Sequence, residues 1–253
     1  MNKTKIEYCD YTWNPVTGCL NKCTYCYARK FAMRFGGSFT LSREEKFLEL
    51  YGRTDNQFPD KFDPTFHRYR LEEPQHIKKP STIFVCSMAD LFGDWVPLNW
   101  IIKVFEACKK APQHRYLFLT KNQSRYNNLA SMTTDNMWFG ITVTNDRETF
   151  NGFPETFKRA AHYPNASDLH NTFISVEPLL QKLYIGFNRF PPDWVIIGAE
   201  TGNRKNKVIP ERKWIVNIVN ECRDRNVKVF MKNNLSAVWE DKLIQELPWE
   251  IRK

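Results

Sequence analysis

The chain has 253 residues, of which 42% are hydrophobic and 26% charged, proportions that are ordinary for a soluble globular protein. Lys and Arg (37) outnumber Asp and Glu (28), and the formal net charge of +9 favours an anionic partner such as nucleic acid or a phosphorylated substrate. A generally basic surface explains this charge equally well. No stretch has the roughly 18 to 20 continuous apolar residues of a membrane span, and the start lacks the apolar core of a secretion signal. We therefore expect a cytoplasmic protein without membrane association, in which the seven cysteines do not form disulfides.

Short apolar runs alternate with amphipathic segments along the chain. A first strand is expected near residues 8–16. Runs rich in β-branched and aromatic residues predict further strands at 82–86, 116–120, 138–143, 173–176, 194–198 and 227–231. Pro97 opens one predicted helix, and residues 214–225 form another. Near-continuous apolar strands alternating with helices are typical of a parallel sheet, so we predict the α/β class, with a full or partial barrel of about seven strands.

Residues 37–80 do not follow this alternation. Their second half, 58–70, is aromatic and basic and is interrupted by prolines. We interpret the segment as an insertion within a single domain that spans residues 1–253. An insertion near the mouth of a barrel could form a lid or a substrate surface, and a packed connector explains the segment equally well.

A group of three cysteines carries the clearest chemical signal. Cys19, Cys23 and Cys26 have the spacing C-x3-C-x2-C. Thiolates are the usual ligands of iron–sulfur clusters, and three local thiolates would hold three irons of a [4Fe–4S] cubane and leave the fourth iron open to a small molecule. Structural zinc usually takes a second pair of ligands downstream, which this chain lacks, although Cys9 could serve as a fourth ligand. The sequence therefore favours an iron–sulfur cluster.

The cysteine motif, with the aromatic Tyr25 directly before its last cysteine, resembles the signature of the radical S-adenosylmethionine (radical SAM) superfamily. In that superfamily the motif follows the first strand of a partial (β/α) TIM-like barrel. The resemblance implies that Cys19, Cys23 and Cys26 bind the cluster. It also implies that the open iron chelates S-adenosylmethionine and that Tyr25 lies beside the adenine.

A closer resemblance covers almost the whole chain. It rests on the segments Trp13–Cys19, Ser87–Phe92, Leu119–Lys121, Ser175–Leu180, Trp194–Gly202 and Phe230–Lys232. They are similar to an uncharacterised radical-SAM-like family that is common in phages and bacterial mobile elements. That family has no settled substrate, so the resemblance implies the cofactor and the fold and leaves the reaction open.

Polar residues follow the predicted strands, where barrels of this kind place their chemistry. In Asp90 we see a candidate for the amino group of S-adenosylmethionine, and in Lys121 one for its carboxylate. The remaining cofactor candidates are Thr142 and Thr144 for the ribose, and Glu177 and Glu200 for ribose hydroxyls or substrate. Superfamily members usually carry a Gly-Gly-Glu-like run where this chain has Ser87–Asp90. Capping of a strand end explains any single residue of this set equally well, and we predict that several of them line one pocket.

Two further features bear on the substrate. Cys86 falls at a strand end and is a candidate hydrogen donor to a substrate radical, with a buried inert thiol as the alternative. A basic loop could hold phosphates, or be an ordinary solvated loop; its cations are Arg204, Lys205, Lys207, Arg212 and Lys213. Aromatic residues in 58–69 could stack bases or pack a lid.

These features together predict a radical SAM enzyme. An external electron donor of the flavodoxin or ferredoxin type would reduce the cluster. The cluster would then cleave S-adenosylmethionine to a 5′-deoxyadenosyl radical that takes hydrogen from the substrate. The expected substrate is a nucleic acid or nucleotide, for modification or repair, and a partner protein could complete the site. One alternative is a radical SAM enzyme that acts on a peptide or small metabolite. Another is a non-catalytic nucleic-acid-binding protein with a structural metal on the three cysteines.

Overall fold

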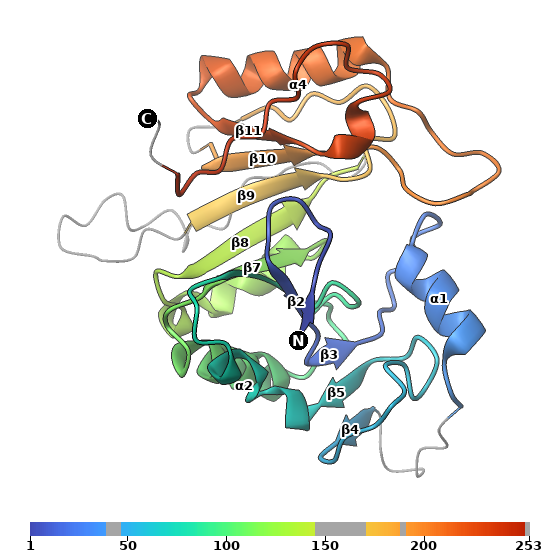
Figure 1. Ribbon diagram of the computed structural model, residues 1–253, viewed down its shortest axis with the longest axis vertical. Helices are drawn as coiled ribbons and strands as arrows, with labels where there is room; N and C mark the ends of the chain where they lie inside the picture. The colour runs from blue at the N-terminus through green and yellow to red at the C-terminus, as the bar shows by residue number, and fades with distance from the viewer. Residues whose placement is uncertain (39–46, 145–170, 188–190, 251–253) are drawn as a thin grey trace. The chain divides into compact units, whose positions relative to one another are not determined.

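The computed structural model describes residues 1–38, 47–144, 171–187 and 191–250 (Figure 1). The chain divides into two compact units, Met1–Met137 and Trp138–Lys253. The prediction of one domain over residues 1–253 stays a prediction. Within the described residues, no helix has the length and apolar character needed to cross a membrane.

The first unit contains two sheets. The larger one has the strand order β1 (Asn2–Lys3), β2 (Tyr11–Trp13), β6 (Thr82–Val85) and β7 (Arg115–Thr120). Strands β2, β6 and β7 are parallel, and β1 is antiparallel to β2. The smaller sheet has the order β3 (Val16–Thr17), β5 (Thr65–His67) and β4 (Leu48–Leu50).

The predicted first strand, 8–16, is wrong in its extent. The chain leaves the larger sheet after Trp13 and joins the smaller one at Val16. Pro15 lies at this break, and it has no N–H to donate to a strand ladder. The polar side chain of Asn14 is placed at the carboxyl end of β2 as a result.

The described part of the first unit contains two α-helices, and each buries one of its faces. Helix α2 (Leu98–Lys109) buries a stripe at helical spacing, namely Trp100, Ile101, Val104, Phe105 and Cys108. Helix α1 (Tyr27–Phe35) buries Ala28 and Ala32 against Phe58 and Phe62. Three aromatic side chains of the predicted insertion, Phe58, Phe62 and Phe66, thus belong to the packed interior of this unit, whereas Tyr51 is exposed. Short 3-10 helices complete it at Arg68–Arg70, Glu73–His76, Gln123–Asn128 and Ala130–Met132.

The second unit is built on parallel strands. Strand β8 (Met137–Thr142) pairs with β9 (Asn171–Val176), which pairs with β10 (Trp194–Ile197), which pairs with β11 (Lys228–Met231). Helix α4 (Arg212–Asp224) lies along this sheet in Figure 1 and buries Ile215, Ile218, Val219 and Cys222. A short 3-10 helix, Asn233–Leu235, follows β11. The α/β class with mainly parallel strands is confirmed, and closure into a barrel stays a prediction.

Candidate iron–sulfur site

The three cysteines lie on the loop between β3 and α1. The loop opens at Gly18, whose φ of +85° suits glycine, and a Cβ there would lie 2.1 Å from the backbone oxygen of Asp63. Gly18 donates its backbone N–H to the carbonyl of Met88 (3.0 Å), and Cys19 donates to the carbonyl of Phe62 (3.0 Å). The entrance of the loop is therefore fixed by close backbone contacts on two sides.

Two sulfur atoms of the loop, those of Cys19 and Cys26, accept backbone hydrogen bonds. Cys26 caps α1, and its sulfur accepts a hydrogen bond from the N–H of Arg29 (3.3 Å). The N–H of Asn21 donates to the sulfur of Cys19 (3.5 Å), and the N–H of Cys26 donates to the carbonyl of Cys23 (3.2 Å). All three cysteines are partly buried and free of disulfides. Amide hydrogen bonds to sulfur and partial burial are features that tune iron–sulfur centres.

Arg29 holds the two ends of the loop together. Its guanidinium donates to the carbonyl of Cys19 (2.6 Å) and lies over the ring of Phe62, 4.9 Å from the centroid. The sequence alone did not single out this residue. Its position three residues after Cys26, in the first turn of the helix that Cys26 caps, is the signal that could have found it.

Asp90 is a buried carboxylate with four hydrogen bonds. Its Oδ2 accepts from the side-chain amide of Asn21 (2.9 Å) and the N–H of Lys121 (3.1 Å). Its Oδ1 accepts from the hydroxyl of Thr120 (2.7 Å) and the N–H of Phe92 (3.1 Å). Asp90 is 5% exposed. Its hydrogen bonds to Asn21 on one side and to Thr120 and Lys121 on the other tie the cysteine loop to the end of β7. Each oxygen already accepts two protein donors, so this geometry fits a structural brace better than the predicted contact with an amino group.

Tyr25 and Lys121 meet beside this brace. The ammonium group of Lys121 lies over the Tyr25 ring, 5.8 Å from its centroid. The structure therefore brings three of the predicted cofactor-binding residues, Tyr25, Asp90 and Lys121, to the cysteine loop.

Asn14 is a second brace that sequence reasoning missed. Its Oδ1 accepts from the hydroxyl of Ser87 (3.2 Å) and from the N–H of Met88 (3.1 Å). The carbonyl of Met88 in turn accepts from Gly18, directly before Cys19. Asn14 could have been found from the sequence as a polar residue that precedes a proline at the end of a predicted strand.

Cys86 follows β6 in the left-handed region, with φ +56°, and is 4% exposed. Burial raises the pKa of its thiol to about 12, and a backbone hydrogen bond from Val16 partly offsets that effect. The thiol is therefore protonated near neutral pH. A hydrogen-donor role for Cys86 stays a prediction.

The chemistry of the three cysteines fits an iron–sulfur cluster. Burial raises the pKa of Cys19 to about 12, and the negative charges of Asp90, Cys23 and Cys26 add to the rise. Anionic Cys23 and Cys26 would thus repel an anionic Cys19, and a bound cationic centre would relieve that repulsion. Among the described residues, no group of three or more His, Cys, Asp and Glu side chains is arranged to hold a metal ion. Binding of a cluster by Cys19, Cys23 and Cys26 stays a prediction.

In the second unit, Glu177 lies at the end of β9. It forms an ion pair with Lys232 (3.0 Å) and accepts from the hydroxyl of Ser175 (3.1 Å). A Cβ on Gly198 would lie 2.8 Å from the Glu177 carboxylate and 3.1 Å from the Lys232 side chain. The ends of β9, β10 and β11 therefore meet at one edge of this sheet.

Glu200 follows β10 and is 2% exposed. Both of its oxygens accept from Arg204 (2.6 Å each), and Oε2 also accepts from the N–H of Val208 (3.3 Å). The Arg204 hydrogen bonds lower the pKa of Glu200 despite the burial of the carboxylate. Thr144 is buried and Thr142 is partly exposed at the end of β8. Cofactor contacts of these four residues stay predictions.

The model of a family described as "Protein of unknown function (DUF5131)" matches residues 3–243, and the chain belongs to that family. No curated protein matches the sequence. Solved structures of spore photoproduct lyase are similar at low identity. One mutant matches with 13% identity and a TM-score of 0.47. A complex with dinucleoside spore photoproduct matches with 11% identity and a TM-score of 0.48. In both cases the match covers 78% of this chain and 58% of the other.

Proposed function

We propose that this chain is a radical SAM enzyme that holds a [4Fe–4S] cluster on Cys19, Cys23 and Cys26. When bound, such a cluster supplies the electron that splits S-adenosylmethionine into methionine and a 5′-deoxyadenosyl radical, which takes hydrogen from a substrate. The observation that carries the proposal is the cysteine loop itself. The sulfurs of Cys19 and Cys26 accept backbone hydrogen bonds, and the loop's entrance and its Asn21 side chain are hydrogen-bonded to neighbouring segments.

The position of Cys9 supports an open fourth iron. Cys9 precedes β2, and the neighbouring Asp10 bonds to Thr82 at the amino end of the parallel strand β6. Gly18 instead bridges to Ala89, beyond the carboxyl end of β6. Cys9 therefore lies at the opposite end of the strands from Cys19 and is unsuited to be a fourth ligand.

The chain's own residues supply binding and orientation. The Tyr25 ring offers a flat surface for adenine, and the ammonium group of Lys121 beside it offers a partner for the methionyl carboxylate. Asp90 and Arg29 hold the loop in place. A fixed loop keeps the cofactor oriented during the reaction.

For the substrate we propose a nucleic acid or nucleotide. The formal net charge of +9 supports this class, as do Lys205 and Lys207, which are exposed on the basic loop. Three other cations of the loop are paired with carboxylates: Arg204 with Glu200, Arg212 with Asp241 and Lys213 with Glu211. Only part of the loop's charge therefore supports this substrate class.

The test uses anaerobically reconstituted protein. Iron and sulfide are counted, and 5′-deoxyadenosine is measured after addition of S-adenosylmethionine and dithionite, with and without DNA or RNA oligonucleotides. We expect about four irons per chain and 5′-deoxyadenosine formation that nucleic acid stimulates. Cys23→Ala should lose both iron and product, whereas the matched variant Cys9→Ala should keep both. Bound zinc without cleavage, or full turnover by Cys23→Ala, would overturn the proposal.

A further inference from the structure

A polar cavity lies in the first unit, next to the segment that Asn14 braces. Its volume is about 280 Å³. Its lining includes Asn14, Arg53, Gln57, Tyr69 and Arg70. This volume is close to the lower end of ordinary ligand pockets and is ample for a phosphate group with a small organic substituent.

The orientation of the Asn14 amide is fixed by its neighbours. Its Oδ1 accepts from the N–H of Met88, which is only a donor, and from the hydroxyl of Ser87. The amide nitrogen must therefore point the other way, so its two N–H groups are the part available to the cavity.

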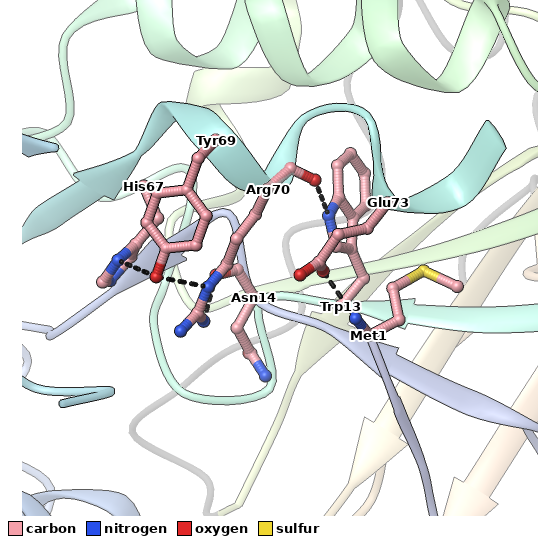
Figure 2. A network of polar contacts seen from close by, with 7 residues as sticks. All are labelled: Met1, Trp13, Asn14, His67, Tyr69, Arg70 and Glu73. Atoms are coloured by element: carbon pink, nitrogen blue, oxygen red, sulfur yellow. Dashed lines mark hydrogen bonds and ion pairs between the residues drawn. The ribbon is translucent and has the colours of Figure 1, made fainter. Parts of the chain in front are cut away.

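Arg70 is fixed in the same manner. It donates from Nε to the hydroxyl of Tyr69 (3.2 Å) and from one terminal nitrogen to the carbonyl of Asn14 (3.0 Å). Its own carbonyl accepts from the indole of Trp13 (2.8 Å). Figure 2 shows the Arg70 guanidinium and the Asn14 side chain extending from the backbone in the same direction. Several guanidinium N–H groups remain beyond those used in these two bonds.

A buried hydrogen-bond chain supports the Tyr69 hydroxyl. Thr17 donates its hydroxyl to the carbonyl of Gln57 (3.1 Å), so it accepts from His67 Nε2 (2.8 Å). His67 Nδ1 is then the acceptor for the Tyr69 hydroxyl (3.4 Å), which leaves the Tyr69 oxygen to accept from Arg70. The donors at the cavity are thus preorganised by groups that cannot reverse their roles.

The charges of the lining favour an anion. Arg70 and Arg53 contribute two cations, and Arg53 is exposed at the rim. Of the two carboxylates, Glu73 is paired with the amino group of Met1 (2.6 Å), which neutralises it. Asp55 is exposed like Arg53 and offsets one cation, so one positive charge remains in the lining. Fixed N–H donors next to a guanidinium are the usual means of binding phosphate oxygens.

We propose that this cavity binds the phosphate group of a phosphate monoester, held by Asn14 and Arg70 with Arg53 at the rim. The proposal does not depend on the radical SAM function. A free phosphate ion shares this chemistry, and the size of the cavity leaves room for part of an attached nucleoside.

The experiment measures binding to the full chain by calorimetry, with thymidine 5′-monophosphate, inorganic phosphate and thymidine as probes. We expect both phosphates to bind and thymidine not to bind. Tighter binding of the nucleotide would identify a nucleoside monophosphate as the ligand, and equal binding would identify the phosphate group alone.

The decisive variant is Asn14→Asp. It keeps an acceptor for Ser87 and Met88 and replaces the N–H groups facing the cavity with a negative oxygen. We expect a loss of affinity of at least about tenfold. Asn99→Asp, an equal charge change at an exposed position of α2, should bind as the wild type does. Arg53→Gln changes an exposed side chain and should weaken binding even if Asn14→Asp does not fold. The proposal would be overturned if phosphate did not bind the wild-type chain. It would also be overturned if the Asn14→Asp and Arg53→Gln variants both bound phosphate as tightly as the wild type does.

Discussion

The two units hold their strand-end carboxylates in different ways. In the first unit, Asp90 is 5% exposed and accepts from neutral donors, namely two backbone N–H groups, an amide and a hydroxyl. In the second unit, Glu177 and Glu200 face the cations Lys232 and Arg204. The two backbone N–H donors are held in place by the fold, whereas a side-chain cation can move to a ligand. The comparison indicates that Asp90 serves structure, and that Glu177 is the better candidate for an exchangeable contact.

The largest expected effect is that of Asp90→Asn. The new amide nitrogen would face donors such as the N–H of Lys121 or Phe92, which leaves buried groups unsatisfied. We expect the free energy of unfolding to fall by about 2–3 kcal/mol, measured by urea denaturation. The reconstituted variant should also hold less iron, because the contact that ties Asn21 of the cysteine loop to the end of β7 is weakened.

Asp94→Asn is the matched control. Asp94 is exposed and accepts from the amide of Asn122 (2.7 Å). We expect a change within about 0.5 kcal/mol. Equal stability of the two variants would show that Asp90 is not the brace that its hydrogen bonds suggest.

The difference between Asp90 and the cysteines also marks how far the sequence could predict the site. The cysteine spacing is local, so the motif was readable within eight residues from Cys19 to Cys26. The role of Asp90 depends on Asn21, 69 residues away, and on Thr120, 30 residues away. No local pattern reports such pairings, and the acid could only be assigned to its strand end.

In the fold, too, the features set by local sequence were predicted and those set by distant contacts were not. Apolar runs predicted β6 to β11 within a few residues, because buried parallel strands are nearly continuous in hydrophobicity. The smaller sheet was not predicted, since β3 has two residues and β4 and β5 have three each, which is too short for a periodic pattern. Its pairing is set by contacts between Val16–Thr17 and Thr65–Phe66 that are distant in sequence.

The buried side chain of His67 should make the stability of the first unit depend on pH. His67 is fully buried in the first unit, and burial, aided by the charge of Arg70, lowers its pKa to about 3. Between that pKa and the ordinary value of 6.5, the unfolded chain binds a proton that the folded chain does not. Stability should therefore fall as the pH drops below 6.5, by about 1.4 kcal/mol per pH unit, or about 2 kcal/mol at pH 5.

The measurement compares the free energy of unfolding at several pH values between about 7.5 and 5. In His67→Gln the free energy of unfolding should change less with pH, because the contribution of His67 is missing. His76→Gln, at an exposed position, should keep it. An identical slope in wild type and His67→Gln would mean that His67 is charged, or is accessible to protons, in the folded chain.

The smallest expected effect belongs to the ion pair of the second unit. The side chains of Lys232 and Glu177 are 19% and 18% exposed, so water screens part of their attraction. A double-mutant cycle with Lys232→Met and Glu177→Gln should give a coupling of about 1 kcal/mol or less, which decreases at high salt. The same cycle on Arg212 and Asp241, which are 46% and 69% exposed, should give a coupling near zero. A Glu177–Lys232 coupling as large as the loss in Asp90→Asn would reverse the comparison, because it would assign the rigid brace to the second unit.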